Sequence, residues 1–238
     1  MKVRKQLDIR RWFCLARPQH PKSCGISSLT SVWNFLFSTL GAGKHRPIST
    51  EEALEVLGFN PPYSNFDFGS FTGNDTLIQW FALLCKFYHV KGGKAQILWK
   101  PRGKTQTLDS VSEDKAHAKL VEGLRSETKA YIYHCWNHYF CPIGFELTPV
   151  KAMDAYAPIS DEMQTETWVI IGEVSKCYPC FHTKRWSDIV TDLTTSYPEF
   201  FNIRKSEMGV QRKESEIFQE GGAKHGGNLH CLIEFESD

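Results

Sequence analysis

The sequence lacks both an excess of charge and any long apolar run. Its 238 residues include 28 basic and 27 acidic side chains, and the formal charge of +1 gives no reason to expect nucleic acid or a membrane surface as a partner. No stretch approaches the roughly 18 apolar residues of a membrane span. The basic start "MKVRKQLDIRRWFC" lacks the apolar run of a secretory signal. We therefore expect a cytoplasmic or nuclear protein.

Internal repeats and long low-complexity tracts are also missing, which argues against a solenoid and against disorder. Hydrophobic residues make up 41% and aromatic residues 13% of the chain, a composition that indicates a densely packed interior. We expect residues 1–238 to form a single domain. Because no secretory signal is seen, the eight cysteines are expected to be reduced thiols rather than a disulfide framework.

The order of the predicted elements indicates an α+β fold. Apolar residues at helical spacing predict a helix over residues 23–40, and the capping-box pattern from Ser49 to Glu52 predicts the start of another. From residue 130 onward, short alternating runs such as "AYIYHCW" and "TWVIIGEV" predict strands. We expect a helical part over about 23–126, followed by an antiparallel sheet over about 130–238.

Cys24 stands where a nucleophilic thiol could be activated. The stretch "QHPKSCGISSL" places it at the predicted start of a helix, and the positive end of a helix lowers the pKa of a thiol. Gly25, the next residue, would let a substrate approach the backbone. Taken alone, Cys24 is more readily interpreted as a buried structural cysteine, because free cysteines are commonly buried.

His138 is the candidate partner of Cys24. It begins the strand pattern "HYFCPIGFEL", and a strand can hold an imidazole rigidly against the end of a helix. His134 is the competing choice, although its place inside a strand pattern is also typical of a core histidine.

Two further residues complete the candidate site. Asp154 lies near the end of a predicted strand, "VKAMDAY", where it could orient His138 if the two strands are adjacent; a turn or capping role is the alternative. Gln19 precedes Cys24 by five residues, so its amide could donate to an oxyanion together with the N–H of Cys24. An ordinary surface glutamine is the alternative for Gln19.

This order of residues resembles the papain-like cysteine peptidase fold. Gln19, "SCG" at a helix start, the distant "NHY" strand and a later Asp follow the order of that superfamily. The loop "HPKS" differs from the papain loop, and no tryptophan follows "SCG". These departures indicate a divergent intracellular branch.

A closer resemblance covers about residues 10–236. The blocks "QHPKSCGISSL", "EEALEVLGF", "FGSFTGN", "AYIYHCWNHYFCPIGFELTPVKA", "WSDIVTDL" and "GGNLHCLIEFE" are similar to the basic, immunoglobulin-like variable motif-containing protein family. Together the two resemblances imply an intracellular thiol hydrolase of papain-like fold.

The resulting functional prediction is a peptidase, deamidase or isopeptidase that acts on an amide bond of a protein or peptide. Cys24 would be the nucleophile, His138 the general base and acid, and Asp154 the orienting carboxylate, with Gln19 in the oxyanion site. No cofactor is expected. The alternative is a catalytically inactive papain-like scaffold that serves as a protein-binding module.

Two weaker motifs predict neither a metal nor a nucleotide site. "CYPCFH" contains Cys177, Cys180 and His182 at the spacing of half a zinc site, but a second ligand pair would have to come from Cys231 and a nearby histidine. "GAGKH" at 41–45 lacks the full spacing of a phosphate loop and ends a helix instead of starting one.

Overall fold

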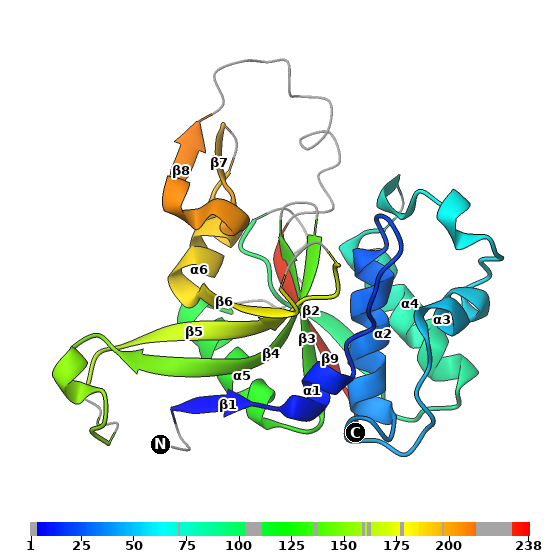
Figure 1. Ribbon diagram of the computed structural model, residues 1–238, viewed down its shortest axis with the longest axis horizontal. Coiled ribbons are helices and arrows are strands. Elements are labelled where there is room, and N and C mark those ends of the chain that lie inside the picture. Colours follow the sequence, from blue (N-terminus) through cyan, green and yellow to red (C-terminus); the bar gives the residue numbers. More distant parts are fainter. Residues whose placement is uncertain are drawn as a thin grey trace.

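An antiparallel sheet lies at the centre of the molecule, and helices pack against both of its sides (Figure 1). The structure is a computed structural model. It describes residues 4–70, 72–102, 111–135, 138–158, 160, 163–176, 179–196, 198–212 and 230–238.

The sheet has seven strands, in the order β2-β9-β3-β4-β5-β6, and β1 pairs with β4 beside that path. The strands are β1 (Lys5–Leu7), β2 (Lys94–Trp99), β3 (Lys129–Cys135), β4 (His138–Pro149), β5 (Thr165–Gly172), β6 (Phe181–Arg185) and β9 (Cys231–Glu236). A separate ribbon pairs β7 (Glu199–Phe201) with β8 (Val210–Arg212). All these strand pairs are antiparallel, so the predicted antiparallel sheet is confirmed.

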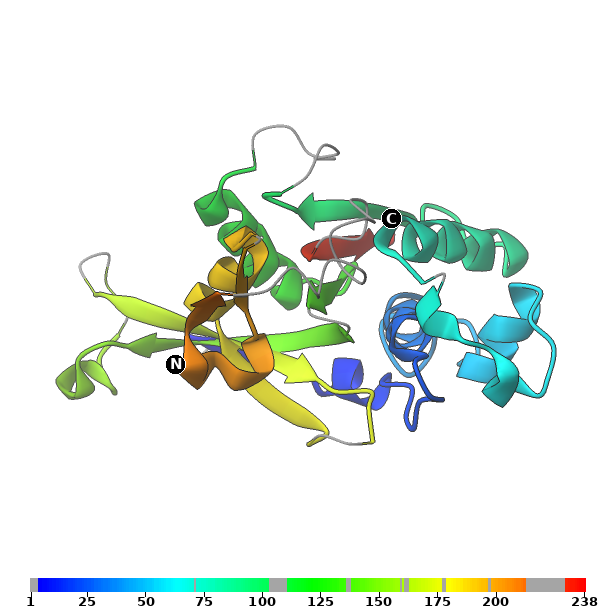
Figure 2. The same cartoon turned by 90° about the horizontal axis from the view of Figure 1, so that it is seen from above.

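The helices gather into two groups around the sheet. They are α1 (Ile9–Phe13), α2 (Cys24–Phe37), α3 (Thr50–Val56), α4 (Asn74–Phe87), α5 (Glu113–Arg125) and α6 (Trp186–Thr194), with short 3-10 turns η1 (Tyr63–Asn65), η2 (Phe68–Ser70), η3 (Ala152–Asp154) and η4 (Ile203–Met208). Figure 2 shows α2, α3 and α4 together at one end of the sheet. None of the helices in the described part of the chain is long and apolar enough to cross a membrane.

Two large hydrophobic cores form because successive side chains of a strand point to opposite faces, and a small third cluster contains Cys141, Ile143 and Val174. Ile132 of β3 joins Leu29 and Trp33 of α2 in the first core. Tyr131 and Tyr133, its neighbours in the chain, join the second core with residues of α5 and α6. Helix α2 is buried almost along its whole length, since it lies between the sheet and the helices α3 and α4.

The α+β prediction is therefore confirmed, with differences in detail. Helix α2 ends at Phe37 instead of residue 40, and the Ser38 hydroxyl donates to the Asn34 carbonyl at 2.7 Å. The segment "AQILWKP", which the sequence predicts to be a short strand within the helical part, is confirmed as β2 and pairs with β9 from the far end of the chain. The predicted strand at "VKAMDAY" is wrong, because this segment contains the 3-10 turn η3.

Candidate active site

Cys24 is the first residue of α2 and is half-buried. The helix starts here because the chain turns at Ser23, whose backbone N–H and hydroxyl both donate to the His20 carbonyl, at 3.1 and 2.9 Å. The first N–H groups of a helix have no acceptor within it and give this end a partial positive charge. The thiol of Cys24 therefore lies where a thiolate, or a negative oxygen formed beside it, is stabilised.

His138 is the first residue of β4 and reaches both Cys24 and an unforeseen carboxylate. Its Nε2 atom lies 2.8 Å from Oε1 of Glu173, and its ring interacts with the side chain of Cys24. Burial lowers the pKa of His138, but the interactions with Cys24 and Glu173 outweigh it, and the net pKa is raised. Because Nε2 serves Glu173, we infer that Nδ1 is the nitrogen that serves the thiol.

Glu173 directly follows β5, and its side chain is fully buried. The register pairs the last residue of β5, Gly172, with Cys141 of β4, so the residue after it arrives beside the start of β4. Oε1 accepts the N–H of Ser175 at 2.9 Å as well as the bond from His138. This double bonding holds the carboxylate in one orientation against the imidazole.

His182 of β6 contacts the same carboxylate from the other side. Its Nε2 atom lies 3.5 Å from Oε2 of Glu173. Burial raises the pKa of Glu173, but the hydrogen bond from His138 and the close contact with His182 outweigh it and lower the pKa to about 2. Glu173 is therefore ionised at neutral pH, between two imidazole rings.

Asp154 does not meet His138, and the predicted pairing is corrected. Strand β4 runs without a turn through residues 146–149 and ends at Pro149. A straight strand of this length separates His138 from Pro149 by roughly 36 Å, at about 3.3 Å a residue. Asp154 follows still later, in η3, where its N–H bonds the Lys151 carbonyl at 3.0 Å. Glu173 occupies the position that the sequence assigned to Asp154.

Gln19 lies in the segment between α1 and α2 and is partly buried. Two bonds hold this segment: Arg17 donates to the Ser175 carbonyl at 3.0 Å, and the N–H of Ala16 donates to the Ser31 hydroxyl of α2 at 2.8 Å. The segment thus connects α2 with the chain just after Glu173. Oε1 of Gln19 is buried and has no hydrogen-bond partner in the described part of the chain.

His134, the competing histidine, lies elsewhere. Its ring stacks on Tyr139 with centroids 4.4 Å apart, and its backbone pairs with Cys231 in the sheet.

The carboxylate beside Cys24 and His138 was missed by sequence reasoning, although a signal existed: Glu173 is a charged residue directly after the apolar strand "TWVIIG".

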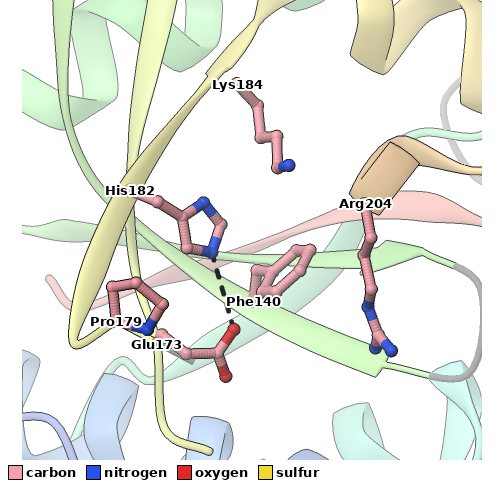
Figure 3. Close-up of a pocket in the computed structure, with 6 residues that line it drawn as sticks. All are labelled: Phe140, Glu173, Pro179, His182, Lys184 and Arg204. Carbon is pink, nitrogen blue, oxygen red and sulfur yellow. Dashed lines mark ion pairs between the residues drawn. The ribbon is translucent and has the colours of Figure 1, made fainter. Parts of the chain in front are cut away.

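A pocket of about 130 Å³ opens beside Glu173 (Figure 3). The residues that line it come from β4, β6, η4 and the segment after β5: Phe140, Glu173, Pro179, His182, Lys184 and Arg204. The ring of Phe140 packs edge-on against His138, with centroids 4.7 Å apart, and against His182, at 5.2 Å. The pocket and the Cys24–His138 pair therefore share the walls formed by Glu173 and Phe140.

The motif "CYPCFH", which has the spacing of half a zinc site, forms no ligand cluster among the described side chains. No group of three or more His, Cys, Asp or Glu residues there is placed to hold a metal ion. Cys177 lies outside the described residues, and His182, its predicted fellow ligand, faces Glu173.

Comparison with known proteins relates the whole chain to one family. A family model described as "Basic immunoglobulin-like variable motif-containing protein" matches residues 1–238. Proteins with this description in Xenopus laevis and Homo sapiens are each 52% identical to the chain, over 236 and 238 residues. These alignments cover 99% of this chain, but 46% of the frog and 45% of the human protein.

A more distant relative comes from Giardia intestinalis. It is 27% identical over 277 residues, an alignment that covers 99% of this chain and 98% of the relative. The chain thus spans a little less than half the length of the vertebrate relatives and nearly the full length of the Giardia protein.

Proposed function

The chain belongs to the basic immunoglobulin-like variable motif-containing protein family, and we propose that it is a papain-like thiol hydrolase acting on an amide bond of a protein or peptide. The observation that carries the proposal is the continuous contact from Cys24 through His138 to Glu173 at the start of a buried helix. A thiol, an imidazole and a buried carboxylate in this order form the machinery of acyl transfer.

The papain-like assignment is supported by the arrangement of the elements. The nucleophile opens a buried helix that packs against β3 and β4, and the histidine opens a strand of the antiparallel sheet. The carboxylate differs from our expectation, since it follows β5 instead of lying in the segment after β4.

The proposed reaction has two steps. First, the thiolate of Cys24 attacks the carbonyl carbon, and His138 gives the former thiol proton to the departing amine as the C–N bond breaks. A water molecule then loses a proton to His138 and attacks the thioester, which releases the acid and restores the thiol. Glu173 orients His138 and stabilises its imidazolium form in both steps.

The oxyanion formed in each step needs donors near Cys24. The backbone N–H of Cys24, at the start of α2, would be one donor, and the amide of Gln19 the second. Gln19 enters this proposal because its segment is bonded both to α2 and to the chain after Glu173.

We place the reaction in the cytoplasm or nucleus, with no nucleic-acid or membrane partner. All seven cysteines that the structure describes are free thiols, as expected in a reducing compartment, and the formal charge is +1. Imaging of the fluorescently tagged full-length protein tests the compartment, and accumulation in the secretory pathway would contradict it.

Alkylation by iodoacetamide near neutral pH tests the activated thiol without knowledge of the substrate. We expect Cys24, followed by mass spectrometry, to react at least about tenfold faster than an ordinary exposed thiol, because a thiolate is the reacting species. His138→Ala should remove this advantage. His134→Phe keeps an aromatic ring over Tyr139 and should leave the rate unchanged.

Ordinary reactivity of Cys24 in the wild type, or equal rates in the wild type and His138→Ala, would reject the thiol hydrolase. The chain would then be better described as an inactive scaffold that binds other proteins. Thermal melting of each variant shows whether it is folded before its rate is compared.

A further inference from the structure

The pocket beside Glu173 combines two cationic side chains with a small volume. Lys184 is on β6 and Arg204 on η4, and their side chains lie on different sides of the ring of Phe140 (Figure 3). The exposure of β6 alternates along the strand, so His182 and Lys184 are half-buried on one face while Arg185 is exposed on the other. The sheet therefore directs His182 and Lys184 together into the pocket.

Lys184 retains capacity to bind a ligand. Its ammonium group donates to the Ile203 carbonyl at 2.8 Å, and an ammonium group has three donor hydrogens. Burial lowers the pKa of Lys184, and the nearby charge of Arg204 also lowers it, while Asp188 and Glu207 partly oppose this effect. An anion in the pocket would relieve the cost of holding these two cations in partly buried positions.

The charge of the pocket favours a monoanion. Lys184 and Arg204 line the pocket with cationic side chains, and the ionised Glu173 forms part of its wall. Because Glu173 repels an anion in proportion to its charge, a singly charged carboxylate fits this wall better than a dianionic phosphate does. A volume of about 130 Å³ equals the share of roughly four water molecules in the liquid, enough for a carboxylate and its adjoining carbon atoms.

His182 offers a contact for the rest of the ligand. Its Nε2 atom faces Glu173, and its Nδ1 atom is buried without a hydrogen-bond partner among the described residues. When Nε2 carries the proton, Nδ1 is an acceptor, and a peptide N–H of the ligand could donate to it. A ligand with a carboxylate next to a peptide group would therefore bind the cationic side chains through its carboxylate and donate its peptide N–H to Nδ1 of His182.

We propose that this pocket binds a carboxylate of the substrate, so that the bond attacked by Cys24 lies close to an acidic group. The carboxylate is either the side chain of Asp or Glu or the C-terminal group of a chain. The assignment of this carboxylate to the substrate of Cys24 rests on the proposed function. Binding of the carboxylate does not require the reaction and can be measured separately.

Binding is measured by NMR titration of the ¹⁵N-labelled Cys24→Ala variant with matched pairs of small peptides. Acetyl-Glu-methylamide and acetyl-Gln-methylamide test a side-chain carboxylate, while acetyl-Ala and acetyl-Ala-amide test a C-terminal one. We expect the acidic peptide of at least one pair to bind about tenfold more tightly than the neutral peptide, because a hydrogen bond to a charged group typically contributes this much to affinity. Inorganic phosphate should compete more weakly than acetate.

Charge-removing variants place the binding in this pocket. Lys184→Met and Arg204→Met, each made in the Cys24→Ala background, should weaken binding of the acidic peptide about tenfold and leave the neutral peptide unaffected. Arg185→Met is the matched control, because Arg185 follows Lys184 directly but stacks on Trp168, with its guanidinium 4.8 Å from the ring centroid. It should bind the acidic peptide as tightly as its Cys24→Ala parent.

Equal affinity for acidic and neutral peptides in both pairs, or equal losses in Lys184→Met and Arg185→Met, would overturn the proposed carboxylate site. Stronger competition by phosphate than by acetate would do the same. Failure of the proposed thiol chemistry has a different signature, an ordinary iodoacetamide rate at Cys24 in the wild type. If the carboxylate binds but Cys24 reacts like an ordinary thiol, the pocket remains a carboxylate-binding site, and its assignment to a substrate of Cys24 is rejected.

Discussion

At the scale of single residues, the candidate site depends on Glu173. The carboxylate is fully buried, yet it is ionised, because two imidazole rings and the N–H of Ser175 surround it. A buried carboxylate without such partners would take up a proton and lose its effect on His138. The raised pKa of His138 and the lowered pKa of Glu173 are therefore two expressions of one contact.

Replacing Glu173 by Gln should lower the iodoacetamide reactivity of Cys24 at neutral pH by at least about tenfold. Loss of the carboxylate charge lowers the pKa of His138. At a pH above that pKa, each unit by which the pKa falls reduces the protonated fraction of His138 about tenfold. Asp154→Asn removes the other candidate carboxylate and should leave the rate unchanged. A loss of reactivity in Asp154→Asn but not in Glu173→Gln would contradict the contacts described above.

Glu173 should also make the free energy of unfolding depend on pH in the acidic range. Its folded-state pKa, about 2, lies below the ordinary value of 4.5, so its contribution to stability is complete above about pH 4.5 and is lost as the pH falls toward 2. We expect the urea midpoint to decrease more steeply over this range in the wild type than in Glu173→Gln, which cannot titrate. Parallel decreases in the two proteins would show that Glu173 carries no such linkage.

At the scale of elements, α2 carries the nucleophile and is fixed by polar contacts as well as by packing. The Asn34 side chain donates to the Ile48 carbonyl at 2.8 Å and accepts the Ile48 N–H at 2.9 Å. These bonds satisfy the backbone of a buried residue in the segment between α2 and α3. They hold that segment against the helix whose first residue is Cys24.

Replacing Asn34 by Leu should lower the free energy of unfolding by about 2–4 kcal/mol, since it leaves a buried N–H and a buried carbonyl without partners. Thr30→Val on the same helix is the control. The Thr30 hydroxyl donates only to the Ile26 carbonyl, within α2, and its loss should cost less than about 1 kcal/mol. Urea unfolding measures both, and equal costs would contradict a specific role of Asn34.

At the scale of the whole molecule, hydrophobic packing buries most of the described thiols. Five cysteines are buried: Cys14, Cys85, Cys135, Cys141 and Cys231. Burial raises the pKa of Cys14, Cys85 and Cys141 to about 12, so these thiols stay protonated and unreactive at neutral pH. Cys24 and Cys180 are half-buried and therefore reachable.

We expect titration with dithiodipyridine to leave these five thiols unreacted in the native protein and to detect all eight cysteines in guanidinium. Mass spectrometry of the native protein after brief iodoacetamide treatment should find label on Cys24 before Cys180. Rapid native labelling of any of the five buried cysteines would show that the cores open more readily than their packing indicates.

Local sequence determined much of the fold and half of the candidate site. Helical spacing and the capping box at Ser49 predicted the helices near the N-terminus, because these signals act within a few residues. Alternation predicted most strands of the sheet for the same reason. Cys24 at a helix start and His138 at a strand start followed from these local patterns.

Only the tertiary structure decided which carboxylate meets His138. That choice depends on where β4 ends and on its register with β5, in which the partners range from Pro149 with Thr165 to Cys141 with Gly172 and so lie well beyond the reach of a local pattern. The same pairing brings His182 and Lys184 of β6 beside Glu173 and so creates the pocket. The alternation of side chains along a strand is a local pattern. Which strands become neighbours is set by burial of the whole sheet between its helices, so it cannot be predicted from a local pattern.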